Sequence, residues 1–167
     1  MSAKDAFFKK VQENNEARQS HEERVRTDIN TFRSRAFSLS KDIELWLQGS
    51  GIQVLQSEDV MYDETVKFVS GNNIDGRYNI TQVRLQNGNK KALLKAEGLY
   101  YMGGSTGCLS LTITNPNRAP SQTKFTLFMH VANQQEEGWT ITRDGQKSPE
   151  GKLLTEDEFF SAIESLA

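Results

Sequence analysis

The strongest pattern in the chain is a stripe of apolar residues spaced four and three apart between Val25 and Trp46. Side chains at this spacing share one face of an α-helix, so the pattern predicts an amphipathic helix over 25–46. At about 1.5 Å per residue this helix is roughly 33 Å long, enough to cross a whole sheet. The glycines at 49 and 51 mark its end. The stripe consists of Val25, Ile29, Phe32, Ala36, Leu39, Ile43 and Trp46.

From Ile52 onward the apolar period falls to two, which is typical of strands that bury one face. Turn-forming residues separate the alternating segments, and Asn87-Gly88 is the best hairpin signal. Gln82 stands where alternation expects an apolar residue, which indicates a bulge or a twist. We expect strands around 52–54, 66–68, 78–80, 91–102, 109–113, 125–131 and 139–141.

A short helix is predicted at the end of the chain, where Thr155 and Glu158 have the spacing of a capping box. Phe159, Ile163 and Leu166 supply its apolar stripe. The expected fold class is therefore α+β, with a long N-terminal helix packed on one face of an antiparallel meander sheet. We expect a polar helical arm over 1–24 and a single domain over 25–167.

The arm and the overall charge narrow the expected partners. Between Gln12 and Arg24 the only apolar residue is Ala17, so a helix there has no face to bury and we expect a solvated extension. Fraying, or ordering on a partner, are alternatives. Twenty basic and 22 acidic residues give a formal charge of −2, which disfavours nucleic acid and anionic membranes as partners. One cysteine and no long apolar run favour a cytoplasmic protein.

Candidate chemistry is sparse, and we expect neither an enzyme nor a cofactor or metal site. The two histidines, His21 and His130, are unpaired by any ligand spacing, which argues against structural zinc. Cys108 lies within a predicted strand and is interpreted as a small inert thiol. The glycine-rich run 103–107 lacks the lysine and the helix of a phosphate-binding loop.

The second face of the sheet is the candidate binding surface. It is polar but barely charged, and an aromatic residue beside a histidine offers an anchor for a protein partner. Ordinary solvent exposure of an antiparallel sheet explains the same pattern. The predicted partner-binding residues are Phe128, His130, Thr112, Thr126 and Thr140, with the acidic pair Glu136 and Glu137.

The end of the chain carries a tryptophan strand, Glu137-Gly138-Trp139-Thr140-Ile141, followed by an acidic capped helix from Leu154 to Phe160. This arrangement resembles the C-terminal part of bacterial immunity proteins that protect against Rhs-type polymorphic toxins. The resemblance implies inhibition by stoichiometric binding to a cognate toxin domain. It carries over no individual functional residue.

Two other functions remain open at this stage. A chaperone-like adaptor for a secreted effector would bind an extended segment along a sheet edge or an apolar groove, and it would more often be a dimer. A small-molecule-binding domain would enclose a pocket lined by aromatics. The candidate aromatics are Tyr78, Tyr100, Tyr101 and Trp139.

Overall fold

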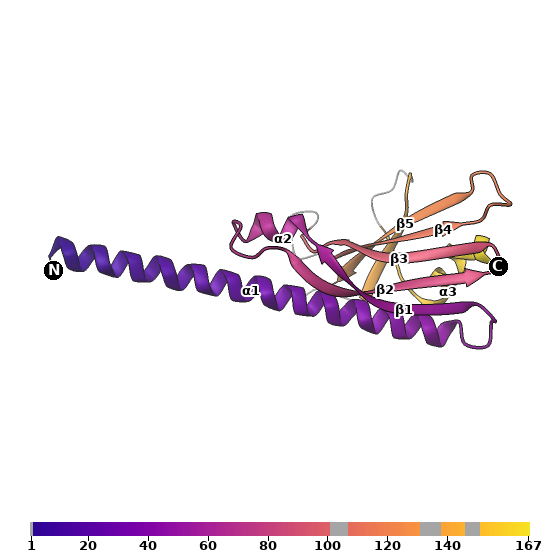
Figure 1. Cartoon of the computed structure of the whole chain (residues 1–167), viewed down its shortest axis with the longest axis horizontal. Coiled ribbons are helices and arrows are strands. Elements are labelled where there is room, and N and C mark those ends of the chain that lie inside the picture. Colours follow the sequence, from indigo (N-terminus) through magenta and orange to yellow (C-terminus); the bar gives the residue numbers. More distant parts are fainter. Residues whose placement is uncertain (1, 101–106, 131–137, 146–150) are drawn as a thin grey trace.

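One long helix lies against an antiparallel sheet, and a short helix lies near the C-terminal end of the long helix (Figure 1). The computed structural model describes residues 2–100, 107–130, 138–145 and 151–167, and of His130 it describes the backbone alone. The long helix is α1 (Ala3–Trp46), and the short one is α3 (Glu156–Ala162). The predicted α+β architecture is confirmed.

The sheet has seven strands, and each strand pairs with its neighbours in sequence, in the order β1-β2-β3-β4-β5-β6-β7. All pairings are antiparallel, so the sheet is the predicted meander. A break in register between Ala96 and Gly98 marks an irregularity in β3. The strands are β1 (Gln53–Tyr62), β2 (Arg77–Asn87), β3 (Lys90–Gly98), β4 (Cys108–Thr114), β5 (Gln122–His130), β6 (Gly138–Arg143) and β7 (Lys152–Leu153).

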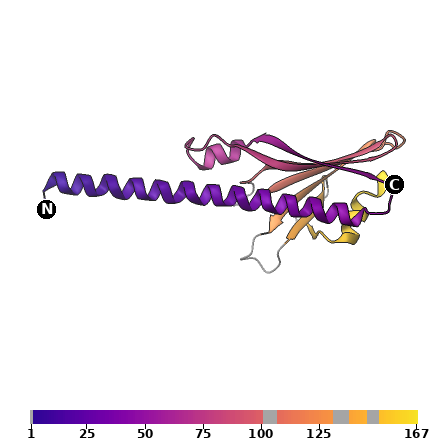
Figure 2. The same ribbon diagram turned by 60° about the horizontal axis from the view of Figure 1, so that its bottom comes forward.

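Helix α1 begins far earlier than the apolar stripe predicts. Ser2 caps it, accepting a hydrogen bond from the Asp5 amide while the Asp5 carboxylate accepts one from the Ser2 amide. Residues 3–21 are all exposed, and Figure 2 shows this part of α1 extending beyond the sheet. The predicted stripe is confirmed: its first six residues are buried and Trp46 is half-buried.

Phe32 is the centre of the contact between α1 and the sheet. Its side chain is fully buried, and the centroid of its ring lies 6.4 Å from the ring centroid of Tyr78 and 6.5 Å from that of Trp139. Gly107, just before β4, lies directly against this ring: a Cβ atom there would come within 2.4 Å of Phe32 Cδ1. A glycine is therefore required for this close approach of strand to helix.

One predicted strand is wrong. The segment containing Val66 and Phe68 forms a short helix, α2 (Glu64–Val69), whose N-cap is Asp63. The Asp63 carboxylate accepts hydrogen bonds from the amides of Thr65 at 3.0 Å and Val66 at 3.4 Å. Val66 is buried and Phe68 is 85% exposed, because residues two apart lie on different sides of a helix, whereas the predicted strand would have placed both on one face.

The hairpin and the irregular alternation of β2 have simple structural causes. Asn87 pairs with Lys90, so the turn consists of Gly88 and Asn89, and the positive φ of Gly88 matches a type II′ turn. The β1–β2 register runs unbroken past Gln82, so the bulge is wrong there. The buried positions of β2 change parity next to Val83, the first residue of β2 that pairs with β3. The part of β2 that precedes Val83 pairs with β1 alone and forms a two-stranded ribbon.

Helix α3 begins as predicted, because Thr155 Oγ1 accepts a hydrogen bond from the Glu158 amide at 3.2 Å. The three predicted apolar residues are buried, but α3 ends before Ile163, and Leu166 lies in a 3₁₀ helix, η1 (Glu164–Leu166). The centroid of the Phe159 ring lies 5.3 Å from that of Trp46 at the end of α1. The side-chain amides of Asn87 and Asn115 donate hydrogen bonds to the backbone carbonyls of Leu166 and Ser165, respectively. These contacts hold the end of the chain against the strand turns.

Candidate partner-binding face

The sheet has one face toward α1 and one face away from it. Apolar residues such as Leu85, Ile113 and Leu127 are buried on the α1 side. The alternate residues of the same strands lie on the opposite side, which we call the open face. Cross-strand pairing aligns one row of the open face from Leu55 through Arg84, Leu93 and Thr112 to Lys124.

The structure places four of the predicted site residues on this open face. Phe128 of β5 pairs with Thr140 of β6, and Thr126 lies two residues before Phe128. Thr112 of β4 pairs with Lys124, so it is a near neighbour of Thr126 across the strands. The four predicted side chains are all half-buried. Because their strands pair side by side, they form one contiguous patch.

The remaining predicted site residues have no described side chains. His130 occupies its predicted place in β5, where its backbone pairs with Gly138. Glu136 and Glu137 lie outside the described residues. The expectation that these three side chains contact a partner stays a prediction.

The open face carries a groove over β1 to β5, and the sequence patterns did not indicate it. The groove has a volume of about 870 Å³. Leu55, 63% exposed, and the half-buried Leu93 provide its aliphatic surface. The available signal was two pairs of adjacent apolar residues, Val54-Leu55 and Leu93-Leu94, because adjacent residues in a strand point to opposite faces.

The charged residues that line the groove are all basic. Arg84, Lys91 and Lys95 line it, and none of its lining residues is acidic. Among described residues, Lys95 lies 3.9 Å from the Glu97 carboxylate, which also accepts a hydrogen bond from Ser110 at 2.7 Å. The groove therefore joins an aliphatic floor to a positive rim in a chain whose formal charge is −2.

A second polar arrangement, around Asp63, is buried on the other side of the sheet. The Asp63 carboxylate accepts hydrogen bonds from the Tyr78 hydroxyl at 2.5 Å and the Leu99 amide at 2.9 Å. Thr65 Oγ1 also donates to Asp63 and accepts from the Tyr100 amide. The Tyr100 hydroxyl donates to Asp28 of α1 at 2.8 Å. This network joins α1, α2, β2 and the segment that follows β3, so its geometry supports a structural role.

The tyrosines of this network are protonated at neutral pH. Burial raises the pKa of Tyr78 above its usual value, and the hydrogen bond to Asp63 raises it further. The pKa of Tyr100 is also raised, first by burial and then by its hydrogen bond to Asp28. Tyr78 and Trp139 are packed in the core, and Tyr101 lies outside the described residues.

The other candidate reactive groups have ordinary surroundings. Cys108 is 4% exposed, and burial, followed by the Glu97 charge, raises the pKa of its thiol to about 12. The thiolate required for nucleophilic attack is therefore scarce at neutral pH. Within the described ranges, no three His, Cys, Asp or Glu side chains gather as a metal site requires. No helix of the described residues is long and apolar enough to cross a membrane.

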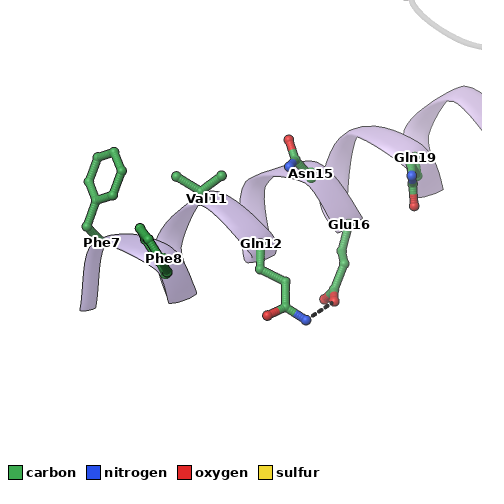
Figure 3. A pocket seen from close by; sticks show the side chains of 7 residues that line it. All are labelled: Phe7, Phe8, Val11, Gln12, Asn15, Glu16 and Gln19. Carbon is green, nitrogen blue, oxygen red and sulfur yellow. Dashed lines mark hydrogen bonds between the residues drawn. The ribbon is translucent and has the colours of Figure 1, made fainter. Parts of the chain in front are cut away.

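The arm carries a second apolar surface near its tip. Phe7, Phe8 and Val11 are 64%, 59% and 43% exposed. Figure 3 shows Phe7 and Val11 on one side of the helix, with Gln12 hydrogen-bonded to Glu16 on the other. The hollow beside them is lined by side chains of this one helix alone, so it has no opposing wall.

Comparisons with protein families, curated proteins and solved structures found no match for the chain. The resemblance to immunity proteins therefore stays a prediction. The open face and its groove are the features of the structure that bear on function.

Proposed function

We propose that the protein is a binding module that acts by stoichiometric contact with another protein through its open face. The observation that supports this proposal is the groove, where partly exposed leucines and three cations share one surface. Apolar surface exposed together with a polar rim is characteristic of protein contact sites. The patch formed by Thr126, Phe128 and Thr140 continues the same face on β5 and β6.

The more specific form of the proposal is an immunity protein that neutralises a cognate bacterial toxin domain. It is supported by the resemblance of the C-terminal residues and by the inert surroundings of Cys108. Binding alone suffices for such a role, because an inhibitor that covers an active site or blocks access to the target needs no chemistry of its own.

The test is affinity capture from the native cell lysate with tagged protein, read by mass spectrometry. We expect the wild type to retain one abundant partner at a fixed ratio, and Leu55→Ser/Leu93→Ser to lose it. Leu45→Ser is the matched control, because Leu45 is 67% exposed on α1, away from the open face. Circular dichroism of each variant checks that the fold is retained.

The identity of the captured protein then separates the functions. A partner with a toxin domain leads to a growth assay, in which co-expression of the wild type rescues growth and the double variant does not. A secreted effector without toxicity would instead support an adaptor. Equal capture by the wild type and the double variant would overturn the open face as the contact surface.

A further inference from the structure

We propose that the groove binds an acidic amphipathic helix of the partner, lying across the strands. This inference rests on the proposed function and adds the chemistry of the partner segment. It is argued from the spacing of Leu55 and Leu93 and from the positions of the three groove cations.

The apolar contacts fix the direction of the bound helix. Arg84 pairs with Leu55 on one side and with Leu93 on the other, so the leucines are separated by two strand spacings. That separation is about 10 Å. In a helix, residues seven apart on one face are separated by about 10.5 Å along the axis. A helix lying perpendicular to the strands can therefore place apolar residues i and i+7 over Leu55 and Leu93.

The cations fix the charge of the bound helix. Arg84 lies between the two leucines, so it faces position i+3 or i+4 of the helix. Lys91 and Lys95 lie two residues before and after Leu93 on β3, about 7 Å to either side of the helix axis. Acidic residues at i+3 or i+4 and along both flanks of the helix would meet all three cations.

Arg84 and Lys91 are available for a partner, whereas Lys95 also lies near the Glu97 carboxylate. In the part of the chain that the structure describes, an ion pair joins Lys95 to Glu97, but none joins Arg84 or Lys91 to a carboxylate. The side-chain amide of Gln82 is oriented so that both its oxygen and its nitrogen have partners. The oxygen accepts a hydrogen bond from Arg84 at 3.2 Å, and the nitrogen donates one to the Asp59 carboxylate. Gln82 thus contacts Arg84 through a neutral group, and no ion pair of the described residues involves Arg84.

Other classes of occupant fit the groove less well. Single-stranded nucleic acid is bound by aromatic platforms as well as cations, and the groove lining contains no aromatic residue. A small ligand is usually enclosed over most of its surface. Here Leu55, which is 63% exposed, lies on an open sheet face, and a protein helix supplies the missing cover.

The test uses a fluorescein-labelled synthetic helix with Leu at i and i+7, Glu at i+3 and Glu along both flanks. Its binding to the full chain is followed by fluorescence anisotropy. A second peptide replaces every Glu with Gln. We expect the Glu peptide to bind at least roughly tenfold more tightly than the Gln peptide, with the difference shrinking as salt is added.

Two charge-reversal variants show where the peptide binds. We expect Arg84→Glu to weaken the Glu peptide at least roughly tenfold. Lys67→Glu is the control, because Lys67 is exposed on α2, outside the groove. The proposal is overturned by absence of binding, by equal affinity of the two peptides, or by equal loss in both variants. Displacement of the Glu peptide by dodecanoate or a single-stranded oligonucleotide at lower concentration than by unlabelled peptide would also overturn it.

Failure of this inference is distinguishable from failure of the proposed function. If affinity capture depends on Leu55 and Leu93 but survives Arg84→Glu/Lys91→Glu, the open face is the contact surface and the acidic helix is wrong. If capture survives Leu55→Ser/Leu93→Ser, the proposed function itself fails.

Discussion

At the scale of single residues, Asp63 accepts several hydrogen bonds at one buried point of the fold. Its carboxylate caps α2 and also accepts hydrogen bonds from the Tyr78 hydroxyl and the Leu99 amide. Asp63 is 2% exposed, and a buried carboxylate persists only when its oxygens are well satisfied. Loss of the Tyr78 hydroxyl would leave Oδ2 of Asp63 with the Leu99 amide as its partner, so this buried oxygen would be less well satisfied.

The buried hydroxyl of Tyr78 predicts how stability changes at alkaline pH. Its pKa is raised in the folded state, by burial first and by Asp63 second, whereas an unfolded tyrosine ionises near pH 10. Its contribution is therefore complete below about pH 10 and is lost as the pH rises further, at roughly 1.4 kcal/mol per pH unit. We expect Tyr78→Phe to remove this part of the alkaline slope in urea unfolding.

Tyr62→Phe is the matched control for this measurement. Tyr62 is 67% exposed and its ring lies 4.9 Å from the Arg77 guanidinium, so its removal should leave the slope unchanged. An alkaline slope in Tyr78→Phe equal to that of the wild type would contradict the explanation.

At the scale of elements, the packing of α1 against the sheet depends on close approach as well as on apolar character. Gly107 brings the start of β4 against the ring of Phe32, and its carbonyl accepts the Met129 amide of β5 at 2.9 Å. This point therefore couples a helix to two strands. A side chain added at Gly107 would meet the ring of Phe32, and this ring cannot move aside into solvent because it is fully buried.

The substitution Gly107→Ala tests this contact. We expect it to lower the free energy of unfolding by about 1–3 kcal/mol, the usual cost of overpacking a core. Phe32→Ala removes the three ring atoms nearest to the new methyl group, Cγ, Cδ1 and Cε1, so in that background Gly107→Ala should cost less. Urea unfolding of both single variants and the double variant gives the coupling free energy. Costs that add within about 0.5 kcal/mol would show that the contact does not control packing.

At the scale of the whole molecule, the arm and the domain make different contributions to stability. Residues 3–21 are exposed along their whole length, so the arm buries little apolar surface on folding. Its one described contact with α2 is between His21 Nε2 and the Val69 carbonyl, at 2.9 Å. The sheet, by contrast, shares its core with α1 from Val25 onward.

Deletion of residues 2–20 should therefore leave the domain folded. We expect the free energy of unfolding to change by less than about 0.5 kcal/mol, as for surface changes generally, while the helical circular dichroism falls. Ile43→Ala provides the scale of a core defect, because Ile43 is 2% exposed and such a change costs about 2–5 kcal/mol. A deletion as costly as Ile43→Ala would mean that the arm supports the core.

Local patterns determined much of this fold. The apolar stripe of α1, the alternation of β4 and β5 and the Thr155 cap of α3 each depend on residues close together in the chain, so periodicity and capping chemistry suffice to predict them. The same alternation placed Thr126 and Phe128 on the open face, because residues two apart in a strand share a side.

The tertiary structure alone decided the rest. Helix α2 is stabilised where Asp63 meets Tyr78 and Leu99, 15 and 36 residues away, and no local pattern contains that contact. The groove exists because strand register brings Leu55, Arg84 and Leu93 into one row from three strands. Sequence periodicity specifies which side of a strand a residue faces, but only pairing between distant segments specifies its neighbours on that side.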